Sequence, residues 1–170
     1  PRTRGVVGET VLQELLSSWL PPSAYRMQYA FRSGARADAV VFFADKRIAI
    51  DAKFPLESVQ RVMHGGATES AGASEMRSAF LRHADAIAER YVRPDEGTLD
   101  FALMYIPSEA VYHFAFVQNT PELFGELQER GVVPVSPGTL FLYIQTAAHA
   151  IRGLSLPEGK KELAAQLDTV

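Results

Sequence analysis

The residues best suited to chemistry lie in one short segment, Asp38 to Pro55, which reads DAVVFFADKRIAIDAKFP. Asp51 and Lys53 are two positions apart at the end of an apolar run, so in a strand both side chains point the same way. The apolar Ile50 and Ala52 then point the other way. An Asp and a Lys on the apolar end of a central strand are costly to bury unless they serve a purpose, so this pair indicates a site.

Asp38 begins the preceding run and becomes part of the same site in one hairpin register. If position 38 pairs with 51 or 53, its carboxylate lies beside Asp51 and Lys53, whereas a slip of one residue places it on the opposite face. We predict the register that brings the three side chains together. Glu9, on the first predicted helix, is a third carboxylate that completes the set.

This set of side chains suits phosphodiester hydrolysis. Carboxylates hold Mg²⁺ or Mn²⁺, hard cations that prefer oxygen ligands, and such a metal polarises phosphate and lowers the pKa of an attacking water. A lysine positions that water or offsets charge on the phosphorus oxygens. We therefore predict Glu9, Asp38, Asp51 and Lys53 as catalytic, with the three acids as ligands of Mg²⁺ or Mn²⁺.

Structural alternatives stay open for each of these residues. Asp51 and Lys53 fit a cross-strand ion pair, Asp38 fits a turn, and Glu9 fits a partner of the helix dipole in a first turn. The acid-x-lysine spacing recurs at Glu158-Gly159-Lys160, and a chain of this composition yields about half such a match by chance.

The spacing of apolar residues predicts an α/β fold, with a central mixed sheet flanked by helices. The segment Gly65 to Ser74 is small and polar and is predicted as a flexible loop. Closure over a bound strand and a simple linker are its two alternative roles. Predicted helices cover 6–20, 56–64, 75–91, 121–130 and 139–152, and predicted strands cover 25–31, 39–43, 47–52, 101–106, 112–117 and 132–135.

Length and composition fit one domain over 1–156 and a weakly packed helical tail over 157–170. The chain has no cysteine, which removes disulfides and thiolate chemistry and favours a cytoplasmic protein. Its apolar runs fall short of the roughly 20 residues that cross a bilayer. Because it begins with Pro1, we expect a piece of a longer protein.

Charge is unevenly distributed along the chain. Residues 1–93 hold 13 Lys and Arg against 10 Asp and Glu, and residues 94–170 hold 4 against 10. A basic half joined to an acidic half fits a localised surface that faces phosphates, so DNA is the predicted partner. The candidate DNA-binding residues are Gln28, Arg77, His83, Ser136 and Thr139. Helix capping is the alternative for the last two. An ordinary strand glutamine is the alternative for Gln28, and a histidine packed beneath the sheet is the alternative for His83.

The chain resembles the RmuC family of bacterial DNA recombination proteins. The resemblance covers about residues 5–152. Its blocks run in family order: Gly8-Glu9 with Leu12 and Leu15-Leu16; Gln28; Asp38-Ala39-Val40-Val41; Ile50-Asp51-Ala52-Lys53 followed by Pro55-Leu56; His83; Leu103-Met104-Tyr105-Ile106-Pro107 with Glu109; and Val135-Ser136-Pro137 with Thr139-Leu140.

The resemblance implies a restriction-endonuclease-like fold of the PD-(D/E)xK nuclease superfamily. That pattern places a helix glutamate, a strand aspartate and an acid-x-lysine pair around a metal, which maps onto Glu9, Asp38, Asp51 and Lys53. Ala37 stands where the superfamily has proline, and Asp51 stands where glutamate is commoner.

The resemblance further implies a metal-dependent deoxyribonuclease acting on recombination or rearrangement intermediates. Family members usually carry an upstream coiled coil, which implies self-association, and often a membrane anchor; neither is in this sequence. A DNA-structure-binding module that does not cut and a repair scaffold of nuclease ancestry are the alternatives.

Overall fold

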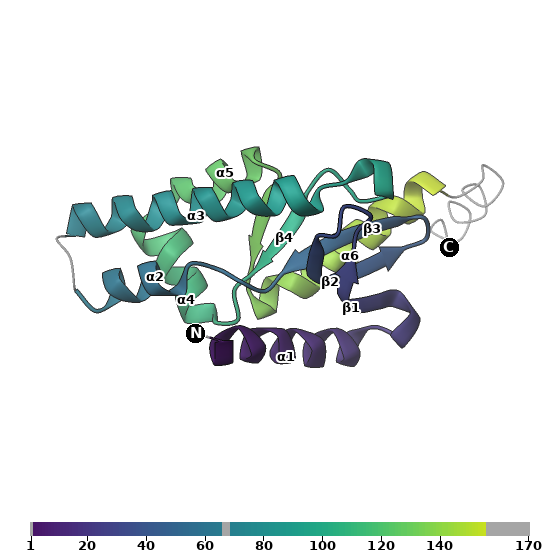
Figure 1. Cartoon of the computed structure of the whole chain (residues 1–170), viewed down its shortest axis with the longest axis horizontal. Coiled ribbons are helices and arrows are strands. Elements are labelled where there is room, and N and C mark those ends of the chain that lie inside the picture. Colours follow the sequence, from purple (N-terminus) through teal and green to yellow (C-terminus); the bar gives the residue numbers. More distant parts are fainter. Residues whose placement is uncertain (1, 66–68, 156–170) are drawn as a thin grey trace, which may run out of the picture.

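The computed structural model describes residues 2–65 and 69–155, which form an α/β fold around a five-stranded mixed sheet (Figure 1). The strand order is β1-β2-β3-β4-β5. The first three strands pair antiparallel, and β4 and β5 add to β3 in parallel. The strands are β1 (Tyr25–Ala30), β2 (Arg36–Phe43), β3 (Lys46–Asp51), β4 (Ala102–Tyr105) and β5 (Val132–Val135).

Helices cover both faces of this sheet, as the sequence predicts. Figure 1 shows α1 along one side of the sheet and α3 along the other. The face under α1 (Arg2–Trp19) and α6 (Pro137–Ser155) buries β-strand residues such as Ile48 and Ile50 against Leu12 and Leu16. The opposite face is covered by α2 (Leu56–Met63), α3 (Glu69–Tyr91), α4 (Glu109–His113), the π-helix η3 (Phe114–Asn119) and α5 (Glu122–Glu129).

The β2–β3 hairpin confirms the predicted antiparallel pairing. A two-residue turn joins the strands, with Ala44 in the left-handed region at φ 56°. The last paired residues are Ala39 and Ile50. This register therefore fixes which side chains meet at the start of β2 and the end of β3.

The first helix approaches the sheet closely at Gly8. A Cβ at this position would lie 3.3 Å from the carbonyl oxygen of Ala52, tighter than most such contacts. Glycine lets the helix backbone come this near to the chain that leaves β3. The next residue, Glu9, is thereby held at the same end of the sheet.

The edge strand β1 changes face at Gln28. Tyr25 and Met27 pack with the cluster under α1 and α6, whereas Tyr29 packs with the cluster on the other face. Gln28 has φ 52°, a left-handed conformation that residues other than glycine adopt rarely. This local twist directs the Gln28 side chain toward α1 and moves Tyr29 to the side of α3.

Two sequence-based predictions are wrong. Residues 112–117 are not a strand, since they belong to α4 and η3. Val111 and Tyr112 share an apolar face with Ala115 and Phe116 at helical spacing, and the Ser108 hydroxyl caps the start of this helix by accepting from the Val111 amide at 3.3 Å.

The predicted flexible loop at 65–74 is the second correction. Helix α3 begins at Glu69, so residues 69–74 are helical. Alanines at 71 and 73 favour a helix, and Gly72 is buried, so this small-residue stretch packs closely. Residues 66–68 and the predicted tail at 157–170 lie outside the described residues.

Among the described helices, none is both long and apolar enough to cross a membrane.

Two buried tyrosines offer a matched test of this fold. Within residues 2–65 and 69–155 the buried Tyr105 hydroxyl has no hydrogen-bond partner, and burial raises the pKa of Tyr105 to about 12. The Tyr91 hydroxyl instead donates to the Arg36 carbonyl at 2.9 Å. We predict that Tyr105→Phe raises the free energy of unfolding by about 1 kcal/mol, whereas Tyr91→Phe lowers it by about 1 kcal/mol. Urea denaturation followed by circular dichroism measures both changes, and equal changes of one sign in the two variants would contradict the assigned contacts.

Candidate active site

Asp38 and Asp51 meet where β2 begins and β3 ends. One step beyond the Ala39–Ile50 pair, the register places Asp38 opposite Asp51. Both are almost fully buried, at 2% and 4% exposure. The predicted register is confirmed, and two carboxylates lie together at one end of an otherwise apolar sheet.

Each oxygen of Asp38 has a partner from the chain that follows β3. The Ala52 amide donates to Oδ2 at 2.7 Å, and Lys53 Nζ donates to Oδ1 at 2.8 Å. The Lys53 side chain is 53% exposed while Asp38 is buried. Lys53 therefore bridges the buried carboxylate and the solvent at the mouth of the site.

Asp51 faces α3 and is held by two donors. Its Oδ1 accepts from the Lys53 amide at 2.8 Å, and His83 Nε2 lies 3.4 Å from the same oxygen. His83 Nε2 also lies 2.6 Å from the Lys53 carbonyl oxygen. Since a carbonyl only accepts, Nε2 carries the hydrogen, and the imidazole fixes the short segment that presents Lys53.

Glu9 reaches the site from α1. Gln28 Nε2 donates to its Oε2 at 2.8 Å. Burial raises the pKa of Glu9, and the charge of Asp38 and a side-chain hydrogen bond with it raise that pKa further, against opposing effects of Lys53 and Gln28. Ionised Glu9 is therefore disfavoured by the fold. Its stabilising effect as a neutral acid is present below the unfolded-state pKa and is lost as the pH rises through the folded-state pKa.

Burial and the neighbouring acids have opposite effects on the pKa of Lys53 and of His83. Burial alone would lower the pKa of Lys53, but the hydrogen bond to Asp38 and the charges of Asp38 and Asp51 outweigh it and raise that pKa. Burial would likewise lower the pKa of His83, and the hydrogen bond and charge of Asp51 raise it. Lys53 is thus positively charged across the neutral range.

The geometry tests the structural alternatives for these residues, namely a cross-strand ion pair, a turn residue and a partner of the helix dipole. The ion pair of Lys53 is with Asp38 rather than with Asp51. Asp38 lies inside β2 and not in a turn. Glu9 lies beyond the first turn of α1, which begins at Arg2, so the partner-of-the-dipole explanation is wrong. All four residues meet at one end of the sheet.

Carboxylate oxygens are the ligand type that a hard divalent cation prefers, and Glu9 lies close enough to Asp38 for Asp38 to raise the pKa of Glu9. Within residues 2–65 and 69–155, however, no three histidine or acidic side chains are gathered in a position to hold a metal ion. Asp38 is engaged by Lys53, and Asp51 is turned toward His83. Binding of a cation to all three acids therefore requires these side chains to exchange partners.

Of the five secondary candidates, Gln28 and His83 join the site and the other three do not. Arg77 forms a two-point ion pair with Glu126 of α5, at 3.0 and 2.6 Å. Ser136 is fully buried, and its hydroxyl accepts from the Thr139 amide at 3.2 Å while the Thr139 hydroxyl accepts from the Ser136 amide at 2.8 Å. These reciprocal bonds are a helix cap.

Tyr91 is a residue of the site's surroundings that sequence reasoning missed. Burial raises the pKa of Tyr91, and the charge of Asp51 adds to this. The available signal was helical spacing, because His83, Ile87 and Tyr91 are four residues apart and share one face of α3.

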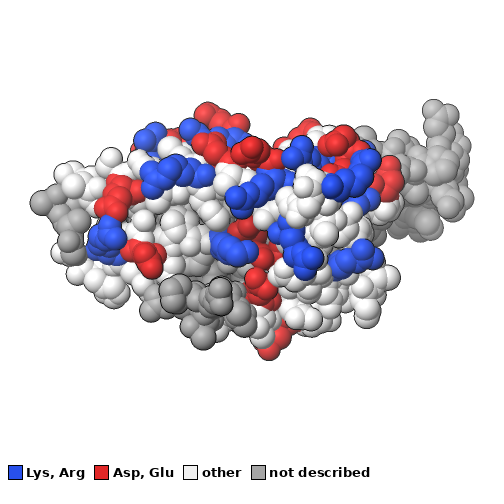
Figure 2. All heavy atoms as spheres, viewed as in Figure 1, with Lys and Arg blue, Asp and Glu red and all other residues white. Residues whose placement is uncertain are grey.

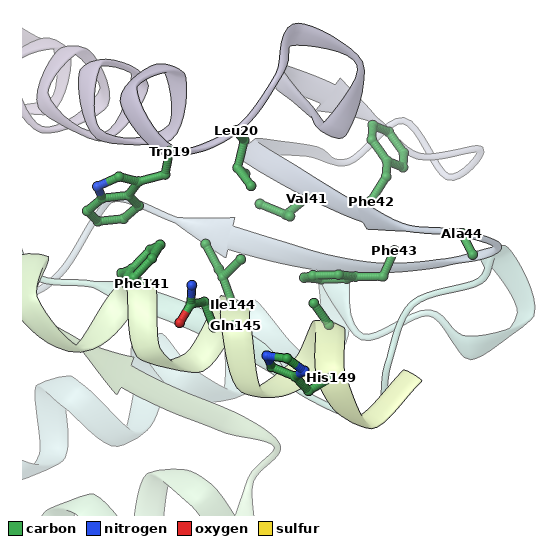
Figure 3. A pocket seen from close by; sticks show the side chains of 11 residues that line it. Trp19, Leu20, Val41, Phe42, Phe43, Ala44, Phe141, Ile144, Gln145 and His149 are labelled. Carbon is green, nitrogen blue, oxygen red and sulfur yellow. The ribbon is translucent and has the colours of Figure 1, made fainter. Parts of the chain in front are cut away.

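A separate apolar pocket of about 380 Å³ lies at the other end of β2, between α1 and α6 (Figure 3). Its lining includes Trp19, Phe43 and Phe141, with Gln145 and His149 as polar groups. It contains none of the acidic residues described above, so we assign the chemistry to the carboxylate site.

Comparison with known proteins identifies the family of this chain. A family model described as the RmuC family matches residues 1–170. The chain belongs to the RmuC family. Its RmuC-family relatives include proteins named DNA recombination protein RmuC in Escherichia coli, with 28% identity over 162 residues, and DNA recombination protein RmuC homolog in Xylella fastidiosa, with 27% identity over 188 residues.

These matches cover most of this chain and a minor part of each relative. The Escherichia coli match covers 89% of this chain and 34% of that protein, and the Xylella fastidiosa match covers 99% and 40%. A homolog from Neisseria meningitidis is 33% identical over 121 residues, which are 68% of this chain and 20% of that protein. The chain thus spans about a third of the length of these relatives. No solved structure matches it.

A titration tests the contact between Glu9 and Asp38. Because Asp38 raises the pKa of Glu9 by charge and by a hydrogen bond, we predict that Asp38→Asn lowers the pKa of Glu9. Lys53→Met should act in the opposite direction, since Lys53 lowers that pKa. Carbon-detected NMR of the Glu9 carboxyl follows both titrations. Glu14, exposed on the same helix, is the internal control, and an unchanged Glu9 titration in Asp38→Asn would refute the contact.

Proposed function

We propose that this domain is a metal-dependent deoxyribonuclease that acts on DNA recombination or rearrangement intermediates. The observation that carries the proposal is the meeting of Glu9, Asp38, Asp51 and Lys53 at one end of the sheet. Two of these acids are almost fully buried, and the lysine head reaches solvent. Buried like charges are costly unless a cation compensates them. Lys53 supplies one positive charge for the three acids, and His83 beside Asp51 supplies a second only when it is protonated.

Glu9, Asp38 and Asp51 would hold Mg²⁺ or Mn²⁺. When bound, such a cation polarises a phosphate and makes its water a stronger acid. The chain's own groups then orient the reaction. Lys53 is charged and partly exposed, so it is suited to contact a phosphate oxygen and to offset charge that develops there. His83 holds the Lys53 carbonyl and so keeps that segment in place.

The same arrangement supports a restriction-endonuclease-like fold. A helix glutamate, a strand aspartate and an acid-x-lysine pair follow in that order on α1, β2 and β3. The mixed sheet and the helices on both faces agree with such a relationship. We infer membership of the PD-(D/E)xK superfamily from this order and placement.

The biological setting is proposed from the relatives, whose names include DNA recombination. DNA is the proposed partner of the site. Self-association through an upstream coiled coil and a membrane anchor on a longer protein remain predictions from the family resemblance. Cytoplasmic placement of this domain remains a prediction from the absence of cysteine.

A DNA-structure-binding module or scaffold that does not cut is the second candidate. It is favoured by one observation: Lys53 and His83 engage Asp38 and Asp51. In that case the ion pairs would stabilise the fold and serve no reaction.

A cleavage assay distinguishes the two candidates. Labelled single-stranded, duplex and branched DNA are incubated with Mg²⁺ or Mn²⁺ and with the wild type, Asp51→Asn or Asp85→Asn. Asp85 is an exposed acid on α3 that pairs with Arg130, so it is a matched control. We predict metal-dependent cutting that falls by at least about 100-fold in Asp51→Asn and persists in Asp85→Asn.

Cutting that survives equally in both variants would refute the assignment of the site. If neither this domain nor the longer protein with its upstream segment cuts any of the substrates, the non-cleaving candidate replaces the nuclease.

A further inference from the structure

A second group of side chains lies on the same sheet but outside the acidic site. The guanidinium carbons of Arg26 and Arg47 lie within 6 Å of two aromatic rings: 5.9 Å from the centroids of Tyr29 and Phe42 for Arg26, and 5.6 Å from both for Arg47. Arg47 also donates a hydrogen bond to the Tyr29 hydroxyl. We call these four residues the arginine–aromatic cluster.

The two arginines of this cluster differ from four other arginines in their ion pairing. Across the described residues, neither forms an ion pair with a carboxylate, whereas four other arginines do: Arg32 with Glu96, Arg61 with Glu75, Arg77 with Glu126 and Arg130 with Asp85. Arg47 is only half-buried, yet its Nε is buried and has no hydrogen-bond partner among the described residues. Most buried N–H groups in proteins donate to a protein or water acceptor, so the Arg47 Nε is an exception.

Open space lies beside Arg47. A pocket of about 420 Å³ has Tyr29, Arg32, Arg47, Asp95 and Glu96 among its lining residues. The backbone of Gly97 forms part of the pocket wall. Gly97 has φ +87°, and a Cβ there would lie only 3.1 Å from the Asp45 carbonyl oxygen, so the backbone packs closely at this point.

The two acids of this pocket, Asp95 and Glu96, differ in how far they offset the charge of Arg47. Glu96 is already engaged, since its Oε1 accepts from the Arg32 amide at 2.9 Å and lies 3.4 Å from Arg32 Nε. Asp95 is exposed and is the remaining acid near Arg47. Arg47 therefore lines a space that an incoming phosphate could enter, and Asp95 is the one exposed carboxylate there that would oppose it.

The cluster faces the same side of the sheet as the acidic site. Arg47 and Asp51 are four residues apart on β3, so their side chains share a face about 13 Å apart. That separation corresponds to about four base pairs along a duplex. Figure 2 shows Lys and Arg side chains spread over this view of the molecule, with acidic side chains between them and along its upper edge.

We propose that the arginine–aromatic cluster binds the sugar–phosphate backbone of the DNA whose other phosphates reach the acidic site. This inference rests on the proposed function. Arginine presents a planar fork of donors that matches phosphate oxygens. Its guanidinium groups already lie against the Tyr29 and Phe42 rings, so these rings are not free for base stacking and the contact is independent of sequence.

A binding experiment tests this contact without relying on cleavage. Fluorescence anisotropy of labelled duplexes of two unrelated sequences is measured with Ca²⁺ in place of Mg²⁺, over a series of salt concentrations. We expect Arg47→Gln and Arg26→Gln each to weaken binding by about 5- to 10-fold for both sequences and to reduce the salt slope by about 1. Asp95→Asn should tighten binding. The control is Arg61→Gln, whose arginine is paired with Glu75.

Three further measurements keep the proposal falsifiable. Arg47→Lys retains the charge if Arg47→Gln fails to fold, and it should bind better than Arg47→Gln. Inorganic phosphate equal in concentration to the DNA phosphates should not displace the duplex, whereas displacement would assign the pocket to a free anion and overturn the proposal. Circular dichroism confirms that each variant is folded.

The outcomes separate this inference from the nuclease assignment. If Arg26→Gln and Arg47→Gln bind DNA as tightly as Arg61→Gln, or the wild type does not bind the duplexes, the cluster is not a DNA contact. If binding depends on the cluster but no substrate is cut, the cluster stands and the nuclease assignment falls.

Discussion

The rest of the site depends on the close approach of the Asp38 and Asp51 carboxylates. Lys53 is paired with Asp38 and lies between it and solvent. Asp38 is almost fully buried and raises the pKa of Glu9, so the fold opposes a second negative charge at this point. Only a scaffold with surplus stability can hold such a group in place. The large apolar clusters on both faces of the sheet supply that stability.

The scaffold reaches this arrangement through three local features. The β2–β3 register brings Asp38 opposite Asp51. Gly8 lets α1 approach the carbonyl of Ala52, which brings Glu9 to the same place. The left-handed Gln28 turns its amide toward Glu9. A change in any one of them would separate the acids, so we regard them as the structural basis of the site.

Sequence alone predicted that the candidate residues lie together, and it predicted the surrounding fold less well. Alternation along β3 predicted that Asp51 and Lys53 share a face, and Ile48 and Ile50 do pack on the other one. The partners within the site were less predictable. That Lys53 pairs with Asp38 while Asp51 faces His83 depends on how α3 crosses the sheet, and spacing within one segment does not contain that information.

The errors in the fold have similar causes. The run at 112–117 is apolar and aromatic, which fits a short strand and a buried helix equally well, and its contacts with the core decided for helix. Small residues at 69–74 resemble a loop in composition, but they allow α3 to extend by more than a turn. The arginine–aromatic cluster joins three strands, so no single stretch of sequence indicated it.

An anomalous-diffraction experiment on crystals of this domain soaked in Mn²⁺ tests whether the carboxylates bind a metal. We predict one strong anomalous peak bound by carboxylate oxygens of Glu9 and Asp38, with Asp51 turned away from His83 to join them, and no peak there in Asp38→Asn crystals. If millimolar Mn²⁺ leaves the Lys53–Asp38 ion pair in place and gives no peak among these acids, the carboxylates are a structural cluster and not a metal centre.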